Sequence, residues 1–214
     1  MRSILLINPN SSAATTDMMV GIAQATAGQQ CRVTGATARR APAMIVDPVA
    51  LEAAADEVLE IAAWNDGSYD GFLIAAFGDP GLSAIRARCR TPAAGIAECS
   101  ICEAAADGRR FGIATTTPEL RSAIDQRVMA SGFARQYTGL RLTSADPIDL
   151  VNDRHRQREA LAETVRRCIE DDGSQAVIIG GGPLGEAARD LQHVFAVPII
   201  SPIPAAMRSI LNSL

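Results

Sequence analysis

Residues 72–82, FLIAAFGDPGL, join an apolar run to a turn rich in glycine and proline, and a similar pattern returns at residues 177–186 as VIIGGGPLGE. In a second pattern, an apolar run stops in hydroxyl or amide residues. It occurs at residues 5–12, LLINPNSS, and again at 112–118, GIATTTP. The spacings agree, because 68 residues separate Asn8 from Ala76 and 66 separate Thr115 from Gly181. This internal repeat predicts two similar halves.

Short apolar runs alternate along the chain with longer segments of helical period, and this alternation is typical of an α/β fold. Strands are expected near residues 3–7, 31–36, 70–76, 92–96, 110–114, 175–180 and 197–200. Helices are expected near residues 14–27, 49–64, 80–90, 97–107, 117–131, 154–171, 184–193 and 203–213. Combined with the repeat, the pattern predicts two similar Rossmann-like α/β lobes, each built on a parallel sheet, whose polar strand ends face one crevice.

Few kinds of reactive group are available to this chain. All 20 of its basic residues are arginines, so a lysine Schiff base, a P-loop lysine and a lysine general base are excluded. Its two histidines, His155 and His193, are too few for a three-histidine zinc site. Five cysteines, the carboxylates, hydroxyls, arginines and backbone amides remain, and we expect no metal.

The composition also limits the partners and the compartment. The net charge is −4 and aromatic residues make up 4% of the chain, which argues against nucleic-acid binding. No apolar run approaches the roughly 18 residues of a membrane-spanning helix, and the run at residues 3–7 is too short for a signal peptide. We therefore expect a cytoplasmic protein with no nucleic-acid or membrane partner and with free thiols.

Neutral hydrogen-bond donors gather where four of the predicted strands end. The candidate substrate-binding residues are Asn8, Ser11, Ala76, Phe77, Gly78, Thr115, Thr116, Gly181 and Gly182. Helix capping is the alternative role for the side chains, and tight turns for the glycines. Two such clusters at equivalent positions of a repeat favour recognition of a small carboxylate or cyclic ureide. The Gly180–Gly182 turn does not match GxGxxG and precedes Pro183, so no nucleotide cofactor is expected.

Two carboxylates stand at predicted strand ends in the first half of the chain. Asp79 lies in the glycine-rich turn, and Glu98 follows the next strand. Asp79 could cap a helix, since aspartate is a preferred N-cap residue, or it could act as a base or orient a water molecule. We take Asp79 and Glu98 as the candidate catalytic residues, because a carboxylate among neutral donors suits hydrolysis, water addition or elimination.

Five segments carry a resemblance to a known family. They are INPNSS at 7–12, AFGDPGL at 76–82, GIAE at 95–98, GRRFGIATT at 108–116 and VPII at 197–200. With these segments the chain resembles the aspartate/glutamate/hydantoin racemase superfamily, closest to its hydantoin racemase branch. The resemblance implies pseudo-two-fold symmetry, a ligand cleft between the lobes, an isomerase-type enzyme without a cofactor, and a homo-oligomer. It also implies that the C-terminal helix returns to the first lobe, which places the lobes at 1–97 plus 203–214 and at 98–202.

The reaction is where the residues depart from the resemblance. Racemases of this family use one cysteine per lobe, and the matching positions here are Ala76 and Gly181. Moving a proton between the two faces of a carbon acid needs two acid/base groups, so two-thiol racemisation is disfavoured. We therefore expect an enzyme that acts on a small carboxylate or cyclic ureide by a carboxylate-assisted isomerase, hydrolase or lyase reaction. The alternative is a non-catalytic protein that binds or senses a small ligand on the same fold.

The five cysteines offer little replacement for the missing pair. Cys99 and Cys102 follow Glu98 closely, so either could lie near the rim of the cleft, but small semi-buried helix residues are the simpler interpretation. The other three, Cys31, Cys89 and Cys168, lie far in sequence from the strand-end motifs and are interpreted as packing residues.

Overall fold

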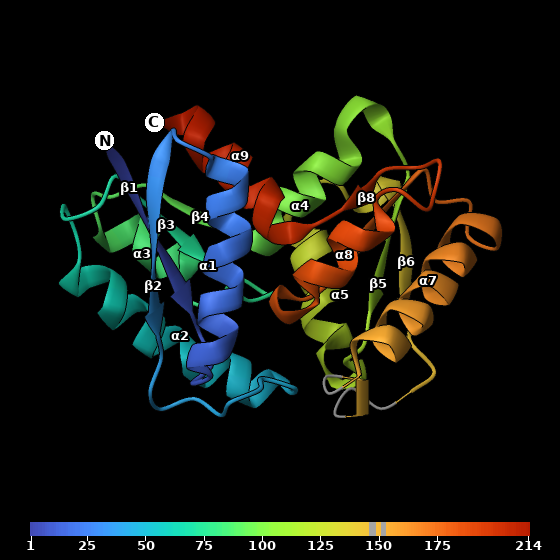
Figure 1. Cartoon of the computed structure of the whole chain (residues 1–214), viewed down its shortest axis with the longest axis horizontal. Coiled ribbons are helices and arrows are strands. Elements are labelled where there is room, and N and C mark those ends of the chain that lie inside the picture. The colour runs from blue at the N-terminus through green and yellow to red at the C-terminus, as the bar shows by residue number, and fades with distance from the viewer. Residues whose placement is uncertain (146–148, 151–152) are drawn as a thin grey trace. The chain divides into compact units, whose positions relative to one another are not determined.

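The computed structural model of the chain describes residues 1–145, 149–150 and 153–214. The chain forms two compact units, one made of Met1–Cys99 and Ile203–Leu214 and the other of Ser100–Pro202. Each unit contains a sheet of four parallel strands with helices packed on it (Figure 1). The predicted α/β fold with two parallel sheets is therefore confirmed.

The first unit has the strand order β2-β1-β3-β4, and all its pairings are parallel. Its elements are β1 (Arg2–Asn8), α1 (Ala13–Ala27), β2 (Cys31–Thr37), α2 (Pro48–Trp64), β3 (Gly71–Ile74), α3 (Leu82–Arg88), β4 (Ala93–Gly95), the start of α4 (Ile96–Ala105) and α9 (Pro202–Ser213). Ile74 pairs with Ile7 on one side and with Gly95 on the other, so β1, β3 and β4 end at one edge of the sheet.

The second unit repeats this arrangement with the strand order β6-β5-β7-β8. Its elements are η1 (Ala106–Gly108), β5 (Phe111–Thr115), η2 (Pro118–Leu120), α5 (Arg121–Ala130), η3 (Ala134–Gln136), β6 (Tyr137–Leu142), α7 (Arg154–Glu170), β7 (Ala176–Ile179), η4 (Gly182–Leu184), α8 (Gly185–Leu191) and β8 (Ile199–Ile200), where η marks a 3-10 turn. Ala114 pairs with Ile179, and Ile178 with Ile200, so β5, β7 and β8 also end together.

The sequence prediction was wrong about one strand, because it placed none at Tyr137–Leu142, where β6 forms. This strand lies at the edge of its sheet and is mostly half-buried. Its sequence, YTGLRL, contains a glycine and an arginine, so it lacks the apolar run that identifies the buried strands. The single helix expected over 117–131 is also divided, into η2 and α5.

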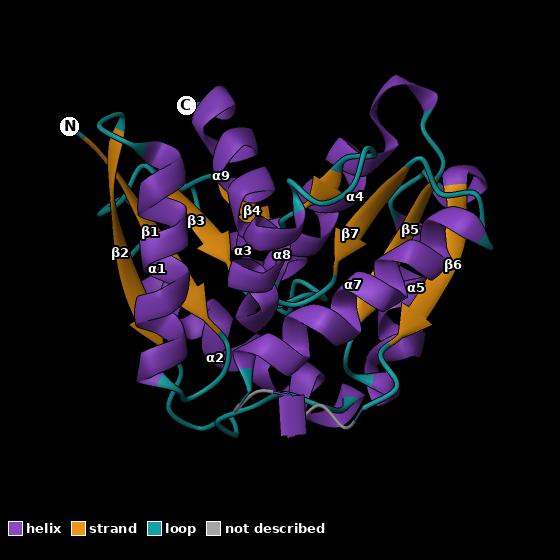
Figure 2. Ribbon diagram, turned by 45° about the vertical axis from the view of Figure 1, so that its right-hand side comes forward, coloured by secondary structure: helices purple, strands orange, loops and turns teal. Residues whose placement is uncertain are grey.

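Two apolar layers enclose the sheet of the first unit. On one face, α1 and α9 pack against strand side chains that include Ile4 and Leu6. On the other face, α2 and α3 pack against Leu5 and Ile7. Strand β1 is therefore buried on both sides, which is why its sequence is a continuous apolar run. Figures 1 and 2 show α1 and α9 on the same side of the sheet.

In the second unit, α7 and α8 cover one face of the sheet (Figure 2). Val165 of α7 and Ala188 of α8 are fully buried there against Val177 and Ile179 of β7. These helices contribute their apolar stripes and leave their charged residues outside. In each unit, the packed core holds the strands, and therefore their carboxyl ends, in fixed positions.

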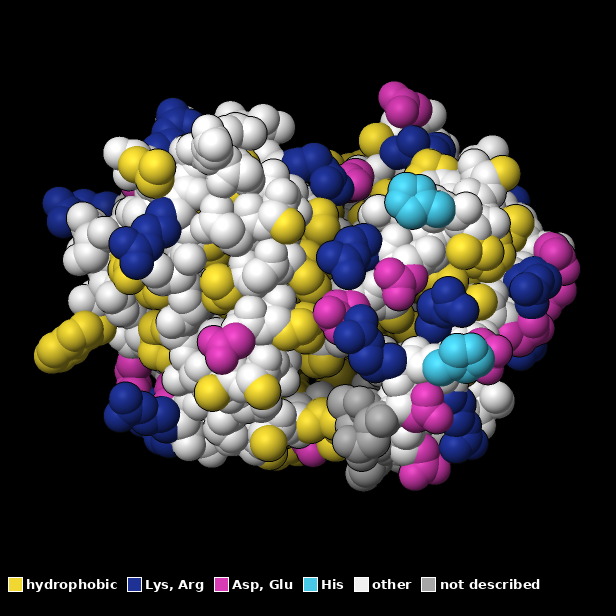
Figure 3. All heavy atoms as spheres, viewed as in Figure 1, with side chains coloured by type: hydrophobic (Ala, Val, Ile, Leu, Met, Phe, Trp, Pro, Cys, Tyr) yellow, Lys and Arg dark blue, Asp and Glu magenta, His cyan; other side chains and the backbone are white. Residues whose placement is uncertain are grey.

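One face of the protein carries side chains of both charges among apolar ones. On the face shown in Figure 3, arginine side chains lie interspersed with acidic ones. Within the described residues, no helix is long and apolar enough to cross a membrane.

Helix α9 is attached to the first unit through buried residues, among them Met207. We expect Met207→Ala to lower the free energy of unfolding by about 2–5 kcal/mol, because the substitution removes apolar contacts and leaves a cavity. Urea denaturation followed by circular dichroism measures this. Asn212→Ala, at an exposed position of the same helix, is the control and should stay within about 0.5 kcal/mol of wild type. Equal effects of the two substitutions would show that α9 is not held by its buried face.

Candidate functional site

Asn8, at the end of β1, organises the turn that leads into α1. Its side chain is fully buried, and its Nδ2 lies within hydrogen-bonding distance of Asn10 Oδ1 (2.9 Å), Thr16 Oγ1 (2.9 Å) and the Ser12 carbonyl (3.2 Å). Its Oδ1 accepts the N–H of Asn10 (3.1 Å). Thr16 Oγ1 lies 2.7 Å from Thr37 Oγ1 at the end of β2. The structure thus places Asn8 where it ties two strand ends and a helix together.

The turn after β3 presents backbone donors beside a small side chain. Ala76 and Gly78 are partly exposed, whereas Phe77 and Asp79 are buried. The Asp79 N–H donates to the Ala76 carbonyl (3.0 Å) and closes the turn. In the described part of the chain, the N–H groups of Phe77 and Gly78 find no acceptor. At Gly78 φ is 153°, and a Cβ would lie 2.7 Å from Leu51 Cδ2, so this position requires glycine.

Asp79 caps a helix, although not the one that follows it in the chain. Its Oδ1 accepts the N–H of Ala97 (2.9 Å) and its Oδ2 accepts the N–H of Glu98 (2.9 Å), both in the first turn of α4. Helix α3 instead begins after Gly81 with no side-chain cap. Asp79 has φ of 50°, a left-handed conformation that aspartate adopts more readily than most residues. Gly95 leaves the space for this carboxylate, because a Cβ there would overlap it.

Glu98, the second predicted carboxylate, pairs with Arg86 of α3. Arg86 Nη1 donates to Glu98 Oε2 (2.9 Å), and Nη2 donates to Oε1. The hydrogen bond that Arg86 donates to Glu98 raises the pKa of Arg86 above its ordinary value. Glu98 is partly exposed, whereas Asp79 is buried. The structure therefore brings the two predicted carboxylates to the same helix start, with Glu98 the more accessible.

In the second unit, Thr115 ties the ends of β5 and β7. Its hydroxyl donates to the Gly180 carbonyl (2.6 Å), and the Gly180 N–H donates to the Ala114 carbonyl (2.8 Å). Thr116 and Thr117 follow, largely buried at 5% and 7% exposure. The hydroxyls of Thr116 and Thr117 form no hydrogen bond with any residue that the structure describes. They are the polar side chains of this turn that are left for a ligand.

The glycine turn after β7 leaves little room for a side chain at its second residue. Gly181 is partly exposed and has φ of 157°, and a Cβ there would lie 3.1 Å from Leu184 Cδ1. The Leu184 N–H donates to the Gly181 carbonyl (3.2 Å). The Gly181 N–H itself has no acceptor within the described ranges. Gly182, which is buried, starts the short 3-10 turn η4.

The cysteines lie in other places and are free. Burial raises the pKa of Cys99 and of Cys168 to about 12. Burial also raises the pKa of Cys31 and of Cys89, and Cys102 is exposed on α4. A thiol with a raised pKa stays protonated near neutral pH and is a poor nucleophile or base. These four cysteines therefore have the properties of packing residues.

The strand-end turns offer neutral donors rather than metal ligands. Counting only residues 1–145, 149–150 and 153–214, no group of three His, Cys, Asp or Glu side chains could hold a metal ion. The available donors are the N–H groups of Phe77, Gly78 and Gly181 and the hydroxyls of Thr116 and Thr117. Such donors suit carboxylate or carbonyl oxygens, because they supply hydrogen bonds without a counter-charge.

The chain matches a sequence model of the Asp/Glu/Hydantoin racemase family over residues 4–210. It belongs to this family. The hydantoin racemase of Paenarthrobacter aurescens is 28% identical over 207 residues, which cover 96% of this chain and 88% of that relative. The structure of allantoin racemase from Klebsiella pneumoniae has a TM-score of 0.93 and 29% identity, over 99% of this chain and 87% of that one. Allantoin racemase from Pseudomonas fluorescens, 21% identical with a TM-score of 0.92 over 99% and 90% of the two chains, shares the fold.

The family predicted from five sequence motifs is thereby confirmed, including its hydantoin branch. The chain is a member of a family of isomerase-type enzymes that act on small molecules. One of the five motifs is GIAE at residues 95–98, and in the structure its glycine, Gly95, makes room for the Asp79 carboxylate.

Three residues of the site were not among the sequence candidates. Nothing in the sequence links Arg86 to Glu98, because a turn and a strand separate them. Gly95 has a role that depends on a carboxylate 16 residues earlier. Thr117 precedes a proline and so is expected to be a cap, but its side chain forms no capping hydrogen bond. Three successive threonines were the signal for this residue, since a cap needs one.

The Asp79 cap generates a stability prediction. We expect Asp79→Ala to lower the free energy of unfolding by about 1–3 kcal/mol, because two N–H groups of α4 lose their acceptor. Asp79→Asn keeps one acceptor oxygen and a residue suited to the left-handed conformation, so its loss should be smaller. Urea denaturation of both variants measures the difference. Wild-type stability in both would contradict the capping role.

The cysteines give a labelling prediction. In the native protein at pH 8 we expect a maleimide to modify Cys102 first, and Cys99 and Cys168 only after unfolding, because burial keeps these two thiols protonated. Peptide mass spectrometry after timed quenching identifies the sites. Rapid native labelling of Cys99 would show that this thiol is accessible and ionised.

Proposed function

We propose that this chain is a cofactor-independent enzyme that binds a small carboxylate or cyclic ureide at its strand-end turns and acts on it without a pair of thiols. The observation that most supports this is the set of donors left without an acceptor in the described part of the chain. They are the N–H groups of Phe77, Gly78 and Gly181 and the hydroxyls of Thr116 and Thr117. Partly or largely buried donors without partners carry a desolvation cost that a ligand can remove.

The relatives support the substrate class. Those reported above are a hydantoin racemase and two allantoin racemases. Hydantoin and allantoin are cyclic ureides, whose ring carbonyl oxygens accept hydrogen bonds from neutral N–H and O–H groups. With no lysine in the chain, an uncharged set of donors at the turns is consistent with a ligand of low charge.

The two turns argue against two-thiol chemistry. Ala76 and Gly181 occupy the positions that correspond to the catalytic cysteines in the family resemblance, and neither residue can transfer a proton. The turn at Gly181 is also adapted to the absence of a side chain, because a Cβ would crowd Leu184. The four buried or half-buried cysteines, with raised pKa values, are poor substitutes.

Glu98 is the carboxylate that we propose as the acid/base group. It is partly exposed, and the Arg86 guanidinium fixes its orientation through two hydrogen bonds. Asp79 would act as a positioning residue, because its carboxylate holds the start of the helix that carries Glu98. A fixed carboxylate can abstract a proton beside a carbonyl group or direct a water molecule at one. An isomerase, hydrolase or lyase reaction is therefore open to it.

Proton exchange tests this function. Enantiopure 5-substituted hydantoins, allantoin and amino acids are incubated with the protein in heavy water, and deuterium at the α-carbon and new products are followed by NMR. We expect exchange or turnover of at least one ureide by wild type. Each of five single Cys→Ala variants should retain it, and Glu98→Gln should lose about 100-fold or more.

Glu52→Gln, at an exposed position of α2, is the matched control and should behave as wild type. Thermal melts of all variants separate loss of activity from loss of fold. Abolition of exchange by one well-folded Cys→Ala variant would overturn the proposal in favour of thiol chemistry. Full activity of Glu98→Gln would remove Glu98 from the reaction.

A second candidate function is a protein that binds or senses a small ligand without chemistry. The engagement of both carboxylates favours it, because Asp79 caps α4 and Glu98 is paired with Arg86. Tight binding of a ureide or dicarboxylate in calorimetry, with no exchange and no product over many hours, would support this candidate against the enzyme. A homo-oligomeric state and a cytoplasmic location stay predictions for either candidate.

A further inference from the structure

The edge of the second sheet carries a cavity that involves none of the predicted site residues. Its volume is about 410 Å³, and it opens beside β6, the strand that the sequence did not predict. Its lining residues are Arg121, Thr138, Gly139, Leu140, Arg141, Leu142, Arg167 and Asp172. Three of these are arginines, and they come from α5, β6 and α7. Three separate elements thus each contribute an arginine to one cavity.

The first arginine, Arg141, is held in place by a carboxylate. Its Nε donates to Asp172 Oδ2 (2.5 Å) and its Nη2 to Asp172 Oδ1 (2.8 Å), with Asp171 Oδ2 a further 3.1 Å from Nη2. The hydrogen bond with Asp172 raises the pKa of Arg141, and the same bond lowers the pKa of Asp172. This bidentate pair neutralises Arg141 and forms a rigid wall of the cavity.

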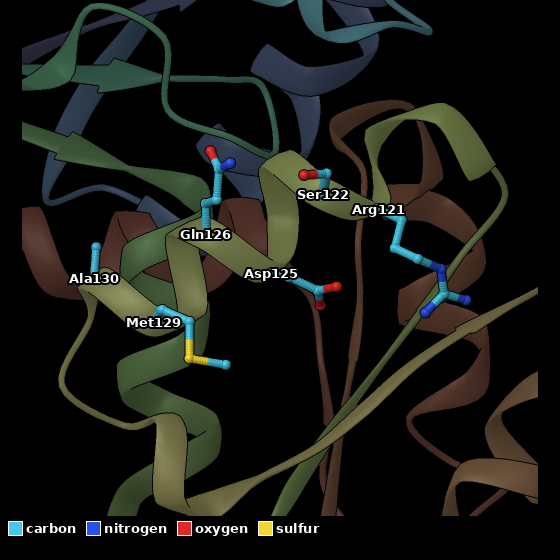
Figure 4. A pocket seen from close by; sticks show the side chains of 6 residues that line it. All are labelled: Arg121, Ser122, Asp125, Gln126, Met129 and Ala130. Atoms are coloured by element: carbon cyan, nitrogen blue, oxygen red, sulfur yellow. The ribbon is translucent and has the colours of Figure 1, made fainter.

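The other two arginines are far less neutralised. Arg121 makes no ion pair or hydrogen bond with the described residues, and Arg167 has one long contact, 3.6 Å from Nε to Asp171 Oδ2. Arg121 begins α5, and Figure 4 shows its side chain and that of Asp125 extending to the same side of the helix. Asp125 Oδ1 accepts the hydroxyl of Tyr137 (2.7 Å). Three carboxylates, Asp125, Asp171 and Asp172, lie beside the three arginines, so the formal charges balance although neither Arg121 nor Arg167 donates a hydrogen bond to a described carboxylate.

The backbone of β6 beside these arginines has no side chain at Gly139. The pairing of β6 with β5 shifts register between Phe111 and Gly112, opposite Tyr137 and Gly139. Gly139 has φ of 127°, and a Cβ there would meet no atom within 4 Å. Irregularities of this kind bend a strand and redirect its side chains, and they are frequent near binding sites. A ligand at this cavity could therefore approach the edge of β6 without meeting a side chain at position 139.

We propose that this cavity binds a small multivalent oxyanion of the phosphate type. The guanidinium groups of Arg121 and Arg167 make no hydrogen bond with the described residues, so their N–H groups are available as donors, and guanidinium geometry suits tetrahedral oxyanions with several oxygens. The fixed Arg141–Asp172 pair limits the cavity on one side, and the carboxylate disfavours deeper entry of an anion there. The site is separate from the strand-end turns and does not depend on the proposed function.

Calorimetric titration with pyrophosphate tests the proposal. Wild type is compared with the double variant Arg121→Gln/Arg167→Gln and with a control, Arg32→Gln/Arg88→Gln, which changes the net charge equally at two exposed arginines elsewhere. We expect the first double variant to bind at least about tenfold more weakly than wild type, and the control to bind within twofold of it. Binding should weaken as sodium chloride is raised.

Two further probes define the ligand class. Inorganic phosphate should bind more weakly than pyrophosphate, because it offers fewer oxygens and less charge. Malonate should also bind more weakly than pyrophosphate, because its planar carboxylates do not present the tetrahedral oxygens of a phosphate group. No measurable pyrophosphate binding, or equal weakening in the two double variants, would overturn the site. Malonate binding as tightly as pyrophosphate would overturn the phosphate assignment. Circular dichroism melts verify that the four exposed substitutions leave the fold intact.

Discussion

Hydrogen-bond satisfaction at the carboxyl ends of the two parallel sheets determines which groups of this protein are free to meet a ligand. Strands that are buried on both faces deliver polar residues into places where an unpaired group is costly. Asn8 answers this need in the first unit and Thr115 in the second, each by tying a strand end to its neighbour. The polar groups left available to a ligand are therefore those that the fold does not already hydrogen-bond.

The same constraint separates the two carboxylates of the first unit. Asp79 fills the space over Gly95 and satisfies two N–H groups of α4, which a helix start must otherwise leave to water or another acceptor. Glu98 is held by Arg86 at the side, where solvent still reaches it. One carboxylate thus stabilises the helix that presents the other. The difference in exposure, rather than the residue type, supports the separate roles that we propose for them.

The cysteines illustrate the opposite effect of burial. Removing a thiol from water disfavours its charged form, which is why Cys99 and Cys168 have raised pKa values. The family resemblance implies thiolate chemistry at two turns, and this chain has alanine at one of them and glycine at the other. The five cysteines of this chain lie elsewhere. A charged side chain also protects the edge strand β6. Arg141 of this strand is held by Asp172, and a charged residue at a sheet edge disfavours pairing with another strand.

The sequence by itself determined the repeat, the α/β class, the family and seven of the eight strands, because buried parallel strands must be continuous apolar runs that end in turn residues. It could not reveal β6, because this mostly half-buried strand contains a glycine and an arginine and therefore has no continuous apolar run. It named Asp79 and Glu98 but left a cap and a base as alternatives for Asp79. Only the tertiary structure decided that Asp79 caps α4, that Arg86 orients Glu98, and that Arg121, Arg141 and Arg167 line one cavity. Each of these depends on contacts between elements distant along the chain, and no local periodicity encodes such distances.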